Sequence, residues 1–173
     1  LDLAKTLEEI SKTKRKSFYE GRLAKEIARF IKDQGGFLSF EDMSNYQSEW
    51  VEPVSSNYRG YDIWELPPNG QGIAALQILN ILEGFDLKAM GLNSAEYVHH
   101  FVEAKKIAFA DRAKYYADPK FNNINIEYLI SKEYAKLRRK EINSSKASQT
   151  DSAGLLKNGD TIYLTTADKD CLL

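Results

Sequence analysis

A short motif near the end of the sequence could carry nucleophilic chemistry: Asp160 is followed by Thr161, where a run rich in β-branched residues begins. A threonine hydroxyl is a poor nucleophile unless a base lies beside it. If the chain is cut before Thr161, the new α-amine is such a base, because its unperturbed pKa is about 7.7–8.0. The residue order therefore allows an N-terminal threonine nucleophile with Asp160 at the cleavage site. The simpler interpretation, a loop that enters a strand, stays open.

A second candidate is the turn Pro-Pro-Asn-Gly-Gln-Gly at residues 67–72, which precedes an apolar segment. The free N–H groups at the start of a helix can bind an anion. The phosphate-loop pattern is absent, however, because no Gly-Lys-Ser/Thr follows the turn. We expect a rigid strand-to-helix connection that at most supports residues in contact with a substrate.

A third candidate combines His99 and Glu103, four residues apart in a long predicted helix, with Lys106 one turn further along. This spacing could supply two metal ligands, but a metal site needs three or four. We expect instead a structural His99 that hydrogen-bonds to Glu103. The sequence predicts no metal and no cofactor.

The other charged residues fit structural roles. Asp111 and Arg112 are interpreted as an ion pair. Glu133 and Glu141 interrupt a basic stripe that has no interleaved aromatic residues for stacking on bases, so the stripe is predicted to be a solvated helix face. Its members are Lys132, Lys136, Arg138, Arg139 and Lys140.

The elements that position these residues are predicted to form an α+β fold, mostly helical with a small β-sheet. Ser39 and Asp42 match a capping box. Residues 51–66 alternate like a pair of strands around a turn at residues 57–60. Apolar residues at helical spacing, together with start and stop signals, predict helices within residues 1–10, 18–34, 39–46, 73–85, 94–117 and 126–142, the last one divided before residue 132.

The last part of the chain changes in character. Residues 143–158 are rich in Ser, Thr, Lys and Gly, which predicts a flexible linker or surface loop. The β-branched run that follows predicts a strand at residues 161–167.

The composition excludes several classes of protein. Lys and Arg total 24 and Asp and Glu total 25 among 173 residues, so a strongly basic nucleic-acid binder is excluded. The longest near-apolar run, residues 73–82, is too short and too polar to span a bilayer. The single cysteine, Cys171, cannot form an internal disulfide, which fits a reducing compartment. We expect a cytoplasmic location for this chain, and a periplasmic or extracellular location stays open for the parent protein. The chain begins at Leu1 without a signal peptide, and we expect it to be a segment of a longer protein.

Short stretches in order along nearly the whole chain resemble the γ-glutamyltranspeptidase family, a branch of the N-terminal-nucleophile hydrolases that includes cephalosporin-acylase-like enzymes. The turn at residues 67–72 and the sequence Thr161-Ile162-Tyr163 resemble the acylase-like branch more than the transpeptidases proper. The matching stretches are residues 3–7, 18–21, 35–36 and 41–42, Tyr46, residues 58–61, 67–72 and 79–83, His99, Glu103-Ala104, and residues 108–112, 118–119 and 159–168.

The resemblance implies a specific chemistry and a parent fold. It implies that a precursor with a four-layer αββα sandwich cuts itself between Asp160 and Thr161, and that Thr161 then attacks a γ-glutamyl or related side-chain amide. Residues 1–142 would be the C-terminal part of the large-subunit region. Residues 143–160 would be the linker before the cleavage point, and residues 161–173 the start of the small subunit.

An alternative from a different class stays open: a truncated remnant that acts only as a fold or binding module. Catalysis needs an oxyanion hole and substrate positioning in addition to a nucleophile. The resemblance implies that these groups lie outside this chain, so the chain alone is expected to be inactive. The expected partner is a small-molecule amide, with a homodimer or the missing segments covering exposed strand edges.

Overall fold

The computed structural model describes residues 1–154, and these divide into two units: Leu1–Trp50 and a second unit that begins at Val51. The first unit consists of helices α1 (Asp2–Thr13), α2 (Lys16–Tyr19), α3 (Arg22–Asp33) and α4 (Phe40–Asn45). The predicted capping box is confirmed, because the Ser39 hydroxyl accepts the Asp42 N–H and the Asp42 carboxylate accepts the Ser39 N–H.

The prediction of one helix over residues 18–34 is wrong, because the helix is interrupted between the end of α2 at Tyr19 and the start of α3 at Arg22. Gly21 forms the N-cap of α3. A Cβ added to Gly21 would lie 2.8 Å from the Ser17 Cα, so the break brings two backbone segments closer than other residue types allow. Hydrophobic periodicity carries no signal for such a close approach.

The second unit begins with a β-hairpin of β1 (Val54–Tyr58) and β2 (Tyr61–Glu65), which pair antiparallel in the register Ser56 to Ile63. The two turn residues, Arg59 and Gly60, both have positive φ, as a type I′ hairpin turn requires. The predicted strand pair and its turn are confirmed.

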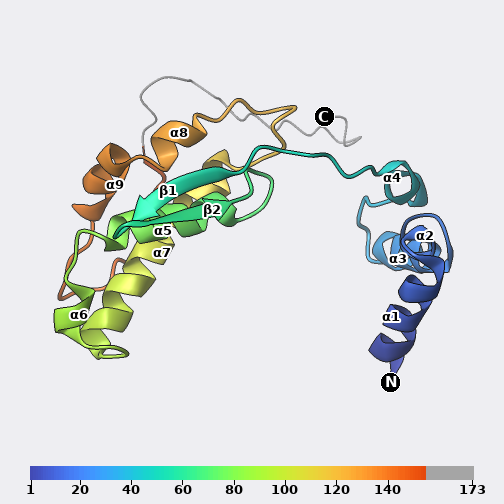
Figure 1. Ribbon diagram of the computed structural model, residues 1–173, viewed down its shortest axis with the longest axis horizontal. Helices are drawn as coiled ribbons and strands as arrows, with labels where there is room; N and C mark the ends of the chain where they lie inside the picture. Colours follow the sequence, from blue (N-terminus) through green and yellow to red (C-terminus); the bar gives the residue numbers. More distant parts are fainter. Residues whose placement is uncertain (155–173) are drawn as a thin grey trace. The chain divides into compact units, whose positions relative to one another are not determined.

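Helix α5 (Gly72–Leu82) is the centre of this unit. Figure 1 shows it between the hairpin and the long helix α7 (Ala95–Tyr115), and it also packs against α9 (Lys132–Arg139). Seven of its residues are buried, among them Ile73 and Leu76 at 0% exposure, so the prediction of a buried helix is confirmed. The short helices α6 (Leu87–Met90) and α8 (Ile126–Leu129) complete the unit.

The expected fold class is confirmed: the described chain is mostly helical and has a small two-stranded sheet. The Ser94 hydroxyl caps α7 by accepting the Tyr97 N–H, as the sequence predicted. The strand expected at residues 161–167, together with Asp160 and Thr161, lies outside the described residues.

Candidate functional site

Gly154 is the described residue nearest in sequence to the predicted nucleophile, Thr161, which follows it by seven residues. The residues that hold this part of the chain therefore form the candidate site. They lie mainly on α7 and α9, and they bind residues 143–154, which we call the strap. The strap contains no helix or strand.

The strap is fastened along α7 by side chains that recognise mostly its backbone. His99 Nε2 donates to the Asn143 carbonyl oxygen over 2.7 Å. One helical turn later, Glu103 accepts the Ser148 N–H over 3.0 Å, and Lys106 donates to the Ser148 carbonyl over 2.6 Å. Asp111 and Tyr115 then bind Gly154. Residues later in α7 bind residues later in the strap, so the strap runs in the same direction as α7.

The predicted hydrogen bond between His99 and Glu103 is replaced by bonds from both side chains to the strap. The structural role of His99 is retained, but its partner is Asn143. The neighbouring His100, which the sequence did not single out, is 1% exposed and donates from Nδ1 to the Glu96 carbonyl over 2.8 Å. Among residues 1–154, no group of three or more His, Cys, Asp or Glu side chains could hold a metal ion.

Glu103 is buried at 2% exposure, yet it stays ionised because of its partners. Burial by itself raises the pKa of the Glu103 carboxyl, but the hydrogen bonds from Lys106 and the Ser148 N–H outweigh burial and hold that pKa below its ordinary value. The Lys106 ammonium lies 3.0 Å from Glu103 Oε1 and 3.4 Å from Asp151 Oδ2.

This lowered pKa predicts a pH dependence of stability. A carboxyl whose pKa is lower in the folded state stabilises the fold above its unfolded pKa, and that contribution is lost as pH falls through the folded pKa. We expect Glu103→Gln to be less stable than wild type at pH 7, with the difference shrinking below about pH 4.3. Urea unfolding at pH 7 and pH 3 measures this. The exposed Glu127→Gln is the matched control, and a pH-independent difference for Glu103→Gln would contradict the expectation.

Asp111 is the centre of the polar network at the other end of the strap. Its side chain is fully buried, and its Oδ1 accepts the Gly154 N–H over 2.8 Å. Its Oδ2 accepts from Gln77 Nε2 and from the Tyr134 hydroxyl, each over 2.9 Å. The predicted ion pair with Arg112 is wrong, because the guanidinium nearest to the Asp111 carboxylate belongs to Arg138, 3.4 Å away on α9.

Two tyrosine hydroxyls of this network act as donors. Burial and the nearby Asp111 carboxylate raise the pKa of both Tyr116 and Tyr134 well above the ordinary tyrosine value. Both therefore stay protonated, with Tyr134 donating to Asp111 and Tyr116 to Gln77 Oε1. The network is thus a set of donors arranged around one carboxylate.

The prediction that the basic stripe is a solvated helix face is wrong for two of its five members, the buried Arg138 and the half-buried Arg139. Arg138 is 4% exposed and donates to the Ser152 carbonyl over 2.6 Å. Lys132 is exposed, as predicted, although its ammonium also lies 2.6 Å from the Glu83 carboxylate. Arg139 donates to the carbonyls of Asn80 and Ile81 at the end of α5, over 2.8 and 2.7 Å. These bonds join α9 to α5 and to the strap.

Arg139 thereby provides a test of how α9 is attached. We expect Arg139→Ala to lower the free energy of unfolding by about 1–3 kcal/mol, because the C-terminal carbonyls of α5 lose charged donors. The exposed Lys136→Ala on the same helix is the control and should change it by about 0.5 kcal/mol or less. Urea unfolding of both variants measures the difference, and equal effects would contradict the assignment.

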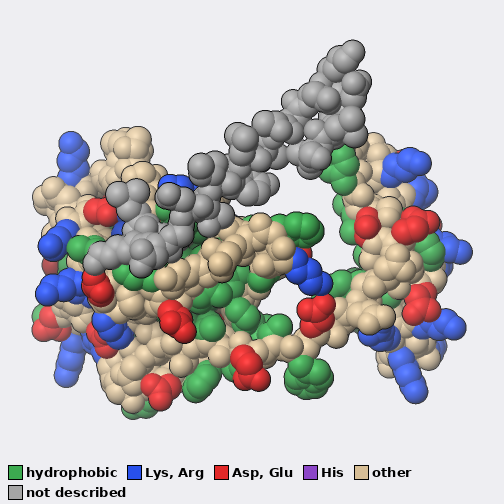
Figure 2. Space-filling model, turned by 90° about the horizontal axis from the view of Figure 1, so that it is seen from above, with side chains coloured by type: hydrophobic (Ala, Val, Ile, Leu, Met, Phe, Trp, Pro, Cys, Tyr) green, Lys and Arg blue, Asp and Glu red, His purple; other side chains and the backbone are tan. Residues whose placement is uncertain are grey.

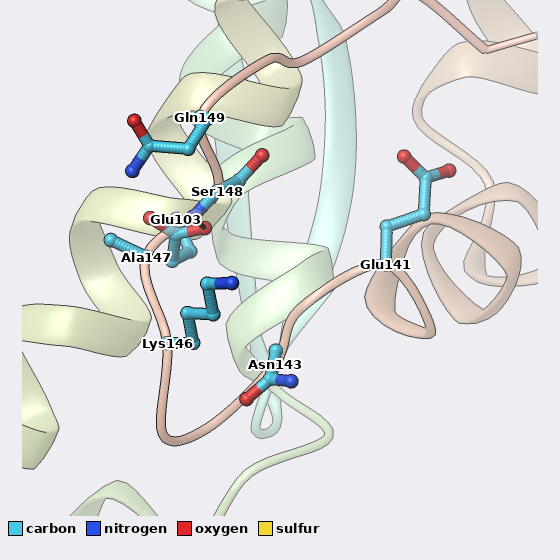
Figure 3. A pocket seen from close by; sticks show the side chains of 7 residues that line it. All are labelled: Glu103, Glu141, Asn143, Lys146, Ala147, Ser148 and Gln149. Atoms are coloured by element: carbon cyan, nitrogen blue, oxygen red, sulfur yellow. Dashed lines mark hydrogen bonds between the residues drawn. The ribbon is translucent and has the colours of Figure 1, made fainter.

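A pocket of about 250 Å³ lies where the strap bends past α7, and Figure 3 shows Glu103 and Ser148 on one side of it with Glu141 on the other. The Glu103 carboxylate is already bound to Lys106 and the Ser148 N–H, and Glu141 accepts from Arg138 over 2.7 Å. Small-molecule sites are usually larger, at about 300–1,000 Å³, and mostly apolar. The pocket therefore belongs to the fastening of the strap, and we assign it no ligand.

The turn between β2 and α5 is closely packed where the helix begins. A Cβ added to Gly72 would lie 2.7 Å from the Leu66 carbonyl oxygen and 2.8 Å from the Glu65 Cβ. Glycine is therefore needed here for a close approach between the end of the strand and the start of the helix.

Figure 2 shows acidic and basic side chains interspersed over the visible face of the described residues. No helix within residues 1–154 is both long enough and apolar enough to cross a bilayer.

Comparison with known proteins agrees with the resemblance inferred from the motifs. The sequence model of the gamma-glutamyltranspeptidase family matches residues 1–172. The chain is 39% identical over 169 residues to the glutathione hydrolase-like YwrD proenzyme of Bacillus subtilis (strain 168), an alignment that covers 98% of this chain and 32% of that protein. It is 40% identical over 170 residues to the acylase ACY 1 proenzyme of Pseudomonas sp. (strain V22), covering 96% of this chain and 30% of that protein.

Solved structures give the same assignment. A cephalosporin acylase from Bacillus halodurans matches with a TM-score of 0.61 and 46% identity, over 81% of this chain and 26% of that chain. The gamma-glutamyltranspeptidase of Helicobacter pylori matches with a TM-score of 0.68 and 35% identity, over 92% of this chain and 47% of that chain. This chain spans about a third of the length of its curated relatives. It belongs to the gamma-glutamyltranspeptidase family of N-terminal-nucleophile hydrolases, of whose fold it forms a part.

Proposed function

We propose that this chain carries the nucleophile of a self-processing amidohydrolase or acyltransferase that acts on γ-glutamyl or related side-chain amides. Thr161 is the nucleophile and Asp160 supplies the carbonyl of the bond that is cut. The observation that carries the proposal is the family match, which extends through this motif to residue 172. The names of the relatives add support, since they describe proenzymes of a glutathione hydrolase type and of an acylase.

The proposed processing step is an attack within the chain. The Thr161 hydroxyl oxygen attacks the Asp160 carbonyl carbon, the peptide C–N bond breaks, and the released nitrogen takes up the hydroxyl proton and becomes the α-amine of Thr161. The ester formed between Asp160 and the Thr161 side chain is then opened by water. This yields a carboxylate at Asp160 and restores the hydroxyl, now on an N-terminal threonine.

Turnover then uses the two groups of Thr161 together. The α-amine takes the hydroxyl proton as the oxygen attacks the amide carbonyl of the substrate, and it returns the proton to the leaving amine. An acyl-enzyme remains, and water or an amino acid accepts the acyl group. Stabilisation of the oxyanion and binding of the substrate carboxylate fall to residues in the rest of the precursor, as the family resemblance implies.

The proposed division of the chain follows from this chemistry. Residues 1–142 form the C-terminal part of the large-subunit region, residues 143–160 lead to the cleavage point, and residues 161–173 start the small subunit. Because the chain spans about a third of its relatives, we expect it to have no turnover by itself. The rival proposal, a remnant that acts only as a fold or binding module, predicts no turnover in any context.

A chimeric precursor separates the two proposals. In it, this chain replaces the matching segment of the YwrD proenzyme of B. subtilis, to which it is 39% identical. We expect the chimeric precursor to hydrolyse γ-glutamyl-p-nitroanilide and the isolated 173-residue chain to leave it intact. A folded chimera that hydrolyses neither this substrate nor glutaryl-p-nitroanilide would overturn the proposed function and favour the remnant.

A further inference from the structure

The strap ends in an anchor that holds both backbone groups of a single residue. The Gly154 N–H donates to Asp111 Oδ1 over 2.8 Å, and the Gly154 carbonyl accepts from the Tyr115 hydroxyl. Asp111 and Tyr115 both lie on α7, one helical turn apart. Two bonds in different directions fix the orientation of the backbone as well as its position.

The anchor accepts glycine alone at this position. A Cβ added to Gly154 would lie 2.2 Å from the Tyr134 Oη and 3.0 Å from the Arg138 Cδ. Tyr134 is itself held by its hydrogen bond to Asp111, and Arg138 by its bond to the Ser152 carbonyl. The neighbouring side chains therefore have little freedom to make room for a methyl group.

We propose that Asp111 and Tyr115, by anchoring Gly154, position the Asp160–Thr161 bond for self-cleavage. This inference rests on the proposed function, and it makes Asp111 and Tyr115 positioning residues of the processing step. Thr161 follows Gly154 by seven residues, a stretch that spans at most about 25 Å even when fully extended. Anchoring Gly154 therefore fixes the start of the short stretch of chain that leads to the scissile bond.

The anchor has a second consequence, which separates positioning from general stabilisation. Before cleavage, Thr161 is joined covalently to Gly154 through residues 155–160. After cleavage that connection is broken, and Thr161 belongs to the other fragment. A positioning role therefore affects the rate of processing and leaves the turnover of the processed enzyme unchanged, whereas a general loss of stability lowers both.

The test measures processing and turnover separately in the chimeric precursor. Processing is followed during cell-free synthesis for wild type, Gly154→Ala and Tyr115→Phe. The control is Ser152→Ala, which removes an exposed side chain from the same strap and keeps the backbone carbonyl that Arg138 binds. We expect both anchor variants to be cut about 10-fold more slowly or worse, since small misplacements of reacting groups cost up to about 10²-fold, and the control to match wild type. Once processed, all variants should have the kcat and KM of wild type for γ-glutamyl-p-nitroanilide.

Two results would overturn the positioning role: anchor variants that are cut at the wild-type rate, or variants whose turnover after processing falls as much as their processing does. A wild-type chimera that is never cut would contradict the proposed function itself. Amide hydrogen exchange on the isolated 173-residue chain tests the anchor without any cleavage. Gly154→Ala should speed exchange at residues 148–154 and leave α5 unchanged, and unaltered exchange in the strap would refute the anchor.

Discussion

Replacing Asp111 by alanine is expected to lower the free energy of unfolding by about 3–5 kcal/mol, the cost typical of removing one partner from a buried ion pair. Asp111 is fully buried and Arg138 is 4% exposed. The substitution leaves the Arg138 cation without this carboxylate. It also takes the acceptor away from the Gly154 N–H, the Gln77 amide and the Tyr134 hydroxyl.

One remaining contact limits the loss. Glu141 accepts two hydrogen bonds from Arg138 Nη1, over 2.7 and 3.0 Å, and is about half exposed, so the cation keeps a partner on its solvent side. We therefore expect the upper end of the range only when Glu141 is also replaced. The two single variants and the double variant form a cycle that isolates the coupling between the carboxylates.

Urea unfolding of the 173-residue chain, followed by circular dichroism, measures the effect of Asp111→Ala. The matched control is Asp62→Ala, because Asp62 is exposed on β2 in the same unit and should cost about 1 kcal/mol or less. If both alanine variants unfold at the same urea concentration, the carboxylate of Asp111 is not the centre of the buried network.

Replacing Thr161 has the largest expected effect on chemistry. In the chimeric precursor, Thr161→Ala should reduce hydrolysis of γ-glutamyl-p-nitroanilide by at least about 10⁴-fold, because the nucleophile and its assisting amine act as one unit. Thr161→Ser keeps the hydroxyl and, after cleavage, the amine, so measurable turnover should remain. Alanine replacement of the neighbouring Thr165 is the control and should retain activity. Equal activity of Thr161→Ala and wild type would exclude Thr161 as the nucleophile.

The helices and the hairpin were predictable because their signals are local. The capping box at Ser39, the cap at Ser94 and the alternation in residues 54–65 act over a few residues, and the structure confirms them. The break at Gly21 was not predictable from periodicity, since it depends on the backbone of Ser17 coming within reach of a Cβ.

The fastening of the strap could not be predicted from its composition. The side chains that hold the strap bind backbone groups of Asn143, Ser148, Ser152 and Gly154, and a side-chain composition does not reveal which backbone groups are bound. The Ser, Thr and Lys content of residues 143–158 therefore predicted a linker. In the structure, the strap at residues 143–154 is held along α7. The signal that could have revealed the strap lies in its partners: buried charges such as Asp111 and Arg138 must find partners outside their own helices.

The charged side chains show the same limit. Asp111 and Arg112 are neighbours in sequence, but successive helix residues point in different directions, so the buried Asp111 meets a residue of another helix instead. The sequence of α9 predicted a solvated basic stripe. In the structure, however, Arg139 donates to carbonyl oxygens at the end of α5. Long-range partners of this kind are set by tertiary packing.

The most direct test of the central claim is the intact mass of the wild-type chimeric precursor, combined with labelling of its free α-amines. The account predicts two fragments that meet between Asp160 and Thr161, with a new N-terminal threonine, and a single uncut chain for Thr161→Ala. A folded wild-type chimera that stays in one piece, or one that is cut at the same bond after Thr161→Ala, would contradict it.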